Sequence, residues 1–349
     1  MQEKVITHIN LAKGFRGGER QTLLLIQELS KRGYTQQLFT RVESELASKL
    51  ENTPNLTIIK ISKPYIFHIT KFKNSSLIHA HETKAAQLAY FVNKFFNIPY
   101  IITRRVDNPI KNNIFNKAIY ENSSYTIALS NAIKSTLTPI SDNINIKIIP
   151  SAYSQLQIDQ KKSSEIKQKF EGKFIIGNIG ELDNAHKGQY YLIEAMKKLQ
   201  QTHPDIHLIF LGKGRDEQNY KEQSKDLKNI TFEGFVSNVS DYINIFDLFV
   251  FPSLHEGLGS ILFDIMQSKV PIIATNSGGI PDIIEDNKNG ILVPIKNSDA
   301  IYEAIIRLYN DKQLREKLSL NGYNNIDNYS YKTMTNKYEN IYNEILNGN

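Results

Sequence analysis

The chain of 349 residues contains no cysteine, which excludes disulfide bridges and thiolate chemistry and is consistent with a reducing compartment. No apolar run approaches the roughly 18 residues that span a bilayer. The first residues, MQEKVITHINLAKG, alternate like a strand and carry no long apolar signal core. Neither paired aspartates nor a cluster of histidines marks a metal site, and no repeat is evident. We therefore expect a cytoplasmic globular protein that holds no metal.

Positive charge is concentrated in the first part of the chain. Residues 1–150 hold 20 Lys and Arg against 10 Asp and Glu, a net charge of +10, whereas the remaining 199 residues hold 22 against 26, a net charge of −4. This asymmetry favours an anionic partner for the first part, such as an acidic membrane surface, a phosphorylated glycolipid or nucleic acid. The alternative is charge that serves only solubility.

Two segments of this basic part alternate lysines with aromatic residues, Lys63–Lys73 and Lys111–Tyr120. Such segments are typical of peripheral contact with an anionic inner membrane surface. No nucleic-acid-binding motif accompanies them, so we expect no nucleic-acid partner. Core aromatics flanked by snorkelling lysines are the other interpretation.

Alternating short apolar runs and helical stretches predict two successive doubly wound α/β domains, because one hydrophobic core rarely serves 349 residues. A strand at residues 4–9 precedes a glycine-containing loop and a helix from Glu19 to Arg32, with Gly33 at its C-terminal cap position. The pattern restarts after Pro150. The expected domains are residues 1–152 and 153–330, followed by a helix at 331–349 that packs across their junction.

Two helices of the second domain are predicted from their spacing. Leu192, Ala195, Met196 and Leu199 stand at i, i+3, i+4 and i+7, and the same spacing recurs in Ser298–Tyr309. Ser298 is a plausible N-cap for the latter helix.

The most informative segment is the run from Phe251 to Pro294. It places Glu256 in a glycine-spaced loop that opens a predicted helix, with Asp264 eight residues later. Eight residues are a little over two helical turns, so we expect both carboxylates on one helix face. Carboxylates accept hydrogen bonds from sugar hydroxyls, and a helix N-terminus favours phosphate. The pattern therefore predicts a site for a sugar phosphate; the alternative is a solvated acidic face.

An ordered set of short motifs resembles the donor-binding domain of the retaining family-4 glycosyltransferases, which have the GT-B fold. The motifs are Gly180-Glu181-Leu182, Lys187-Gly188, Phe210 to Gly214, Glu233-Gly234-Phe235, Pro252-Ser253, Glu256 to Gly259, Asp264, Ala274-Thr275, Gly278 to Asp282, and Asn289-Gly290. The first half is similar to the family more loosely, through Gly17-Gly18 before a helix, Leu77–His81 and Ile149-Pro150.

This resemblance implies an enzyme of two Rossmann-like domains with its active site in the cleft between them. The enzyme transfers a sugar from a nucleotide-sugar, which is a co-substrate, and it needs no cofactor. It implies that Glu256 lies against the donor sugar, Asp264 holds the ribose and Lys187 neutralises the leaving diphosphate. Further donor-binding residues implied are Gly17, Gly18, Gly212, Lys213, Gly257, Leu258 and Gly259. The donor expected is a UDP-sugar, and the acceptor a glycan or glycolipid of bacterial lipopolysaccharide or surface polysaccharide.

The chain departs from the family pattern at two donor positions. The second acid is usually glutamate, and Asp264 is one methylene shorter. The family has an arginine where Glu181 stands, so one phosphate contact is missing, and Arg215 or Arg16 is the conjectured substitute.

On the acceptor side, Thr103 to Asp107 replaces the segment in which many members carry a histidine. Arg104 and Arg105 are expected to meet an acceptor phosphate, and Asp107 and His81 are expected to be catalytic; a salt-bridged loop is the alternative. His79 is expected to be structural.

Two other functions stay open from the sequence. Glu181 and Asp264 motivate a degenerate family member that only binds nucleotide or glycan. A nucleotide-sugar epimerase or a phosphorylase shares the fold, although no pyridoxal lysine site can be located.

Overall fold

The computed structural model describes residues 4–154 and 156–348 and divides the chain into two compact α/β units. Unit 1 comprises the chain up to Ala152 and from Asn328 onward, and unit 2 comprises Tyr153–Asp327. The helix 331–349 expected at the end of the chain is α14, Tyr331–Asn347, which belongs to unit 1. Its expected packing across a junction stays a prediction.

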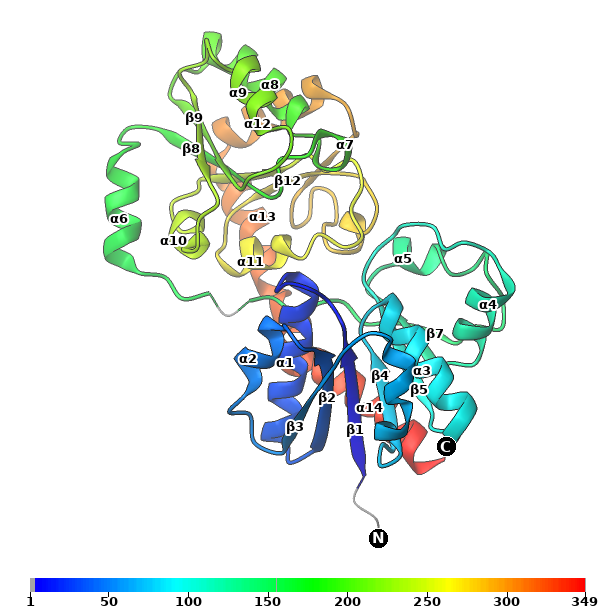
Figure 1. Cartoon of the computed structure of the whole chain (residues 1–349). Helices are drawn as coiled ribbons and strands as arrows, with labels where there is room; N and C mark the ends of the chain where they lie inside the picture. The colour runs from blue at the N-terminus through cyan, green and yellow to red at the C-terminus, as the bar shows by residue number, and fades with distance from the viewer. Residues whose placement is uncertain (1–3, 155, 349) are drawn as a thin grey trace. The chain divides into compact units, whose positions relative to one another are not determined.

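Unit 1 is a parallel seven-stranded sheet in the order β3-β2-β1-β4-β5-β6-β7 (Figure 1). Its strands are β1 Val5–Asn10, β2 Thr35–Arg41, β3 Leu56–Ile61, β4 Leu77–Ala80, β5 Tyr100–Arg104, β6 Tyr125–Ala128 and β7 Ile146–Ile148. Its helices are α1 Gly17–Lys31, α2 Glu45–Leu50, η1 Tyr65–Phe72, α3 Thr83–Phe96, α4 Ile114–Glu121, α5 Asn131–Ser135 and α14.

Unit 2 is a parallel six-stranded sheet in the order β10-β9-β8-β11-β12-β13. Its strands are β8 Phe174–Ile179, β9 Ile206–Leu211, β10 Ile230–Gly234, β11 Leu248–Phe251, β12 Ile272–Thr275 and β13 Ile291–Val293. Its helices are α6 Gln160–Gln168, α7 Asn184–Lys187, α8 Gln189–Thr202, α9 Glu217–Gln223, α10 Val239–Ile243, α11 Ile261–Gln267, η2 Ile280–Asp282, α12 Ser298–Asn310 and α13 Lys312–Asn324, and η3 Ile326–Tyr329 leads back to unit 1.

Local sequence signals account for several of these helices. The apolar residues of α8 and α12 at i, i+3, i+4 and i+7 are buried in the core of unit 2, as predicted. Gly33 follows α1 with φ +83°, in the left-handed region that glycine adopts at helix ends. The predicted N-cap of α12 is wrong by one residue, because the side chain of Asn297 accepts the Ala300 amide at 2.9 Å.

The C-terminal helix completes the core of unit 1. Tyr338 and Tyr342 of α14 are buried with Ile6 of β1 and Leu77 of β4, and α14 also packs on α1. Burial of two such large side chains stabilises the end of the chain on this sheet. Within the described residues, no helix is both long enough and apolar enough to cross a membrane.

Candidate active site

The predicted donor residues of unit 2 gather where its strand order reverses. Strand β8 is flanked by β9 on one side and by β11 on the other, so the loops that follow β8 and β11 leave neighbouring carboxyl ends of the sheet. In open α/β sheets this switch point is where ligands bind. The connection after β8 includes the short helix α7, which ends at Lys187, and the loop after β11 carries Glu256.

Lys187 and Glu256 form an ion pair, with 2.6 Å between Nζ and Oε2. Their side chains are 26% and 16% exposed, so both are partly desolvated and still reachable by a ligand. The ammonium also lies 5.7 Å from the ring centroid of Phe251. A charge-assisted contact of this kind orients both groups. An anionic ligand can replace Glu256 as the partner of the ammonium, and the released carboxylate can then accept hydrogen bonds from hydroxyls.

Hydrogen bonds from two neighbouring segments fix the loop that carries Glu256. The Leu254 amide donates to the carbonyl of His186 at 2.7 Å, which ties it to the loop of Lys187. The hydroxyl of Ser277 donates to the Leu254 carbonyl, also at 2.7 Å. Gly278 has φ +53°, and a Cβ there would lie 1.9 Å from the carbonyl oxygen of Glu256. Only glycine therefore permits this close approach.

The expectation that Glu256 and Asp264 share a helix face is wrong. Helix α11 begins at Ile261, so Glu256 lies in the preceding loop and helical spacing does not relate the two acids. Asp264 is on α11, is 8% exposed, and accepts the backbone amide of Ser154 at 2.7 Å. Its Oδ1 thus holds the start of unit 2 against α11, and its expected contact with a ribose stays a prediction.

The other predicted donor residues border the same edge of the sheet. Gly257, Leu258 and Gly259 continue the loop of Glu256, and Gly212 and Lys213 follow β9. Glu181 is exposed after β8. Arg215, the conjectured substitute for the missing arginine, pairs with Asp183 at 2.6 Å and is 64% exposed.

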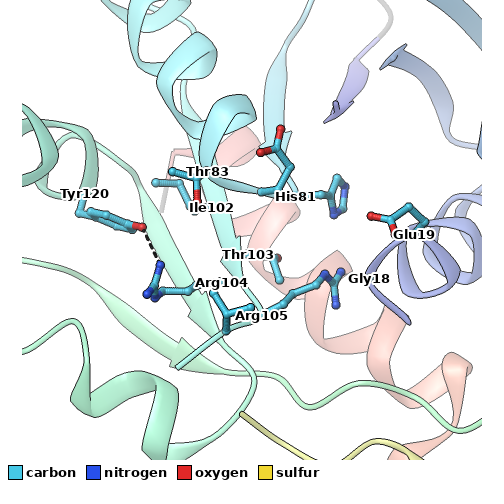
Figure 2. A pocket seen from close by; sticks show the side chains of 11 residues that line it. Gly18, Glu19, His81, Thr83, Ile102, Thr103, Arg104, Arg105 and Tyr120 are labelled. Carbon is cyan, nitrogen blue, oxygen red and sulfur yellow. Dashed lines mark hydrogen bonds between the residues drawn. The ribbon is translucent and has the colours of Figure 1, made fainter. Parts of the chain in front are cut away.

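Unit 1 repeats this arrangement at its own switch point. Strands β1 and β4 are neighbours there, and a pocket of about 390 Å³ is lined by Gly18, at the start of α1, and by His81, directly after β4 (Figure 2). The remaining lining residues are Glu19, Glu82, Thr83, Ile102, Thr103, Arg104, Arg105, Val106 and Tyr120. Gly17 and Gly18 begin α1, whose first amides lack partners within the helix and favour an anion.

The two neighbouring arginines of this pocket have different surroundings. Arg104 is 7% exposed and donates from Nε to Thr136 at 3.3 Å, with further bonds to Tyr120 and the Asn108 carbonyl. Arg105 packs against Gly18 and forms no hydrogen bond or ion pair with the described residues. Burial lowers the pKa of its guanidinium. A partly buried guanidinium without a partner points to an anionic ligand, so Arg105 is the better candidate of the two.

His81, which lines this pocket, lies beside two further buried histidines, His8 and His79. His8 of β1 is in register with His79 of β4, and His81 follows β4. Burial lowers the pKa of His8 to about 4 and lowers the pKa values of His79 and His81 well below the usual range, with the charge of Arg105 adding to the effect on the latter two. All three are therefore neutral at pH 7.

The ligand atoms of these histidines are close enough for a metal ion, but almost all of them are already engaged. His8 contacts His81 and Gln36, at 3.0 and 3.1 Å. His79 contacts the hydroxyls of Tyr342 and Thr103, at 2.6 and 2.7 Å, in agreement with the structural role expected for it. Only Nδ1 of His81 lacks a partner. Because the other ring nitrogens are already engaged and the positive charge of Arg105 is nearby, the cluster is poorly suited to a cation.

Sequence reasoning singled out His81 but missed His8 and Gln36. The signal available was that β1 and β4 are adjacent, which places His8 beside His79. Asp107, predicted as catalytic, is partly exposed, does not line this pocket and forms no hydrogen bond or ion pair with the described residues.

Part of the chain is similar in sequence to known glycosyltransferases. The model of the family described as glycosyl transferases group 1 matches residues 159–325. EpsD of Bacillus subtilis, which is named as a glycosyltransferase, is 34% identical over 168 residues, covering 47% of this chain and 44% of EpsD. The chain thus matches less than half the length of that relative. LpsE of Rhizobium meliloti, named as a lipopolysaccharide core biosynthesis glycosyltransferase, is 23% identical over 354 residues, covering 95% of this chain and 97% of LpsE.

The fold is shared with solved glycosyltransferase structures. HepE of Anabaena in complex with UDP-glucose superposes with a TM-score of 0.83 at 18% identity, covering 97% of this chain and 98% of HepE. The two Rossmann-like parallel sheets match the GT-B architecture, which confirms the predicted fold class.

The neutral histidines make the stability of unit 1 sensitive to acid. In the unfolded chain they titrate near pH 6.5, whereas burial in the folded protein lowers the pKa of His8 to about 4 and lowers the pKa values of His79 and His81 well below 6.5. The unfolded state therefore binds more protons below pH 6.5. We expect the free energy of unfolding to fall as the pH drops from 6.5 towards 5, by up to about 1.4 kcal/mol per pH unit for each histidine.

Urea unfolding followed by circular dichroism at several pH values measures this slope. His8→Gln should reduce the slope by about the contribution of one histidine. His255→Gln, which changes an exposed side chain of unit 2, should leave the slope unchanged. Equal slopes in His8→Gln and the wild type would contradict the assignment.

Proposed function

We propose that the chain is a retaining, metal-independent glycosyltransferase, because it has the GT-B fold and its residues 159–325 match the glycosyl transferases group 1 family. It moves a sugar from a UDP-sugar to a glycan or glycolipid acceptor of a bacterial lipopolysaccharide or surface polysaccharide. The ion pair of Lys187 and Glu256 at the switch point of unit 2 carries this proposal. HepE in its complex with UDP-glucose and the naming of LpsE support the donor and the acceptor class.

In the proposed reaction the leaving diphosphate forms an ion pair with the ammonium of Lys187 in place of Glu256. The charge that develops on the leaving oxygen is then met by a preorganised cation in a partly desolvated site. Glu256, released from its partner, accepts hydrogen bonds from the donor sugar and fixes its position. These groups neutralise the leaving group without a divalent ion. Retention would follow the front-face substitution known for the family, in which the leaving phosphate helps to deprotonate the acceptor.

Unit 1 supplies the proposed acceptor half-site. Arg105 takes an anionic group of the acceptor, and His81 borders the same pocket. Arg104 shapes the loop through its bonds to Thr136 and Tyr120. Gly17 and Gly18 present the amides of α1 to a phosphate.

A binding subunit without catalytic activity is the second candidate. It is favoured by Asp264, whose Oδ1 already accepts the Ser154 amide, and by the acidic side chain of Glu181 where the family has an arginine. Such a protein would bind UDP and turn over no nucleotide-sugar.

Turnover of nucleotide-sugars tests the proposed catalytic pair. Release of UDP from a panel of UDP-sugars should be detectable for the wild type, with and without a crude glycolipid acceptor. Glu256→Gln and Lys187→Ala should each reduce the rate by about 100- to 1000-fold, the loss typical of removing one group that stabilises the transition state. Lys198→Ala, which removes a surface ion pair with Asp299, is the matched control. Full activity of Glu256→Gln would refute the assignment.

We further propose that unit 1 contacts the anionic cytoplasmic face of a membrane. Residues 60–120 hold ten Lys and Arg against two Asp and Glu. The helices η1, α3 and α4, which contact one another through α3, expose Phe67, Phe95 and Ile114 at 77%, 65% and 91%. Between η1 and α3 lies an apolar pocket of about 420 Å³, with Lys63 and Lys84 among its lining residues. Exposed aromatics among lysines suit the interface of an anionic bilayer.

Sedimentation with vesicles tests the membrane contact. The protein should bind vesicles of phosphatidylglycerol and phosphatidylcholine, and the binding should weaken with salt and with loss of the anionic lipid. Lys71→Gln with Lys73→Gln should weaken it by about 5- to 30-fold, since each lysine near such a surface contributes about 1 kcal/mol. Phe67→Ser should weaken it as well, whereas Phe235→Ser in unit 2, an equally exposed phenylalanine at 78%, should not. Equal binding to neutral vesicles would contradict the contact.

A further inference from the structure

A line of buried polar side chains crosses the middle of the sheet in unit 1. Gln36 of β2, His8 of β1 and His81 after β4 are at most 3% exposed. Gln36 contacts His8, with 3.1 Å between Oε1 and Nε2, and His8 contacts His81, with 3.0 Å between Nδ1 and Nε2. The line ends at the pocket that His81 helps to form.

The positions of the protons along this line follow from the hydrogen bond that fixes the side chain of Gln36. The amide Nε2 of Gln36 donates to the backbone carbonyl of Ile26 at 3.1 Å, so Oε1 is the atom that faces His8. A carbonyl oxygen only accepts, and His8 must therefore carry its proton on Nε2. In a neutral imidazole the other nitrogen then bears a lone pair. Nδ1 of His8 consequently accepts, and Nε2 of His81 donates to it.

The last atom of the line is Nδ1 of His81. Since the proton of His81 is on Nε2, Nδ1 carries a lone pair, and it has no partner in the described structure. The same pocket is lined by Arg105, whose Nε also has no partner (Figure 2). The charged residues that line the pocket with His81 are Glu19, Glu82, Arg104 and Arg105. The lining of the pocket thus combines a cation with a buried hydrogen-bond acceptor of fixed direction.

We propose that Gln36 and His8 are positioning residues that hold His81 in the single tautomer whose Nδ1 accepts a hydrogen bond in this pocket. The group bound beside His81 is then a donor, a hydroxyl, and it lies next to the anionic group that Arg105 binds. The ligand class is a phosphorylated polyol or sugar. This specificity rests on the proposed acceptor half-site, whereas the tautomer is a property of the free protein.

The tautomer is measured by long-range ¹H–¹⁵N NMR of the full chain labelled on its eight histidines, with His81→Gln identifying the signals of His81. We expect His81 to be protonated on Nε2 and unprotonated on Nδ1 throughout the neutral pH range. A proton on Nδ1, or a mixture of both tautomers, would overturn it. This result does not depend on enzymatic activity, so failure of the proposed function would leave it standing.

Substitution of Gln36 tests whether the line sets the tautomer. In Gln36→Glu the carboxylate favours a charged His8, whose Nδ1–H then donates to Nε2 of His81 and moves the proton of His81 to Nδ1. Gln36→Met removes the acceptor and should give a mixture, which keeps the test available if the glutamate variant does not fold. Thr7→Val is the control, because it removes a buried hydrogen bond of 2.7 Å between Thr7 and Ser75 on the same strand as His8. A wild-type tautomer in both Gln36 variants would refute the positioning role.

The ligand class is tested with two probes on the wild-type protein. Glycerol 3-phosphate offers both a phosphate and hydroxyl donors, whereas sulfate offers an anion without a proton to donate. We expect glycerol 3-phosphate to shift the Nδ1 resonance of His81 and sulfate to leave it in place. An equal response to both probes, or a response to neither, would overturn the assignment of a hydroxyl to this position.

Discussion

The contact of 2.6 Å between Nζ of Lys187 and Oε2 of Glu256 is the interaction on which the donor half of the site depends. The two residues come from the loops after β8 and β11, and they meet only because these strands are neighbours at the reversal of the strand order. Close backbone approach is needed as well. Gly188, with φ +61°, leaves 2.3 Å between a would-be Cβ and the Pro252 carbonyl, so a larger residue would push the two loops apart. Gly188 and Gly278 thus both serve the geometry of one ion pair.

Unit 1 applies the same topological rule to different chemistry. Its pocket also lies at a reversal of strand order, between β1 and β4, but its cation is unpaired and its acceptor is a neutral imidazole. Burial keeps the histidines uncharged, and the backbone carbonyl of Ile26 fixes the direction of their hydrogen bonds through Gln36. Burying the guanidinium of Arg105 without a direct ion pair is costly, although the charge of Glu19 in the same pocket favours its charged form. Its retention beside an oriented acceptor is explained most simply by a ligand that carries both an anion and a hydroxyl.

The sequence predicts local features of this protein better than long-range ones. Apolar spacing located α8 and α12, and the glycine and acid motifs located the loops of Lys187 and Glu256, because these signals lie within one element or turn. The helical relation of Glu256 to Asp264 was wrong, since α11 starts only at Ile261. The line from Gln36 to His81 joins three strands separated by tens of residues, so no spacing reveals it. Arg104 and Arg105 are adjacent in sequence and differ only in what the fold places around them.

Calorimetric titration with UDP tests the central claim most directly, because the two residues of the ion pair are expected to affect UDP affinity in different ways. Lys187→Ala removes a phosphate partner and should weaken UDP binding by at least 10-fold. Glu256→Gln removes the group that competes for the ammonium, so it should leave UDP affinity unchanged or increase it while transfer is lost. If both substitutions weaken UDP binding to the same extent, or if neither changes it, Lys187 does not hold the diphosphate and the account of the donor site is wrong.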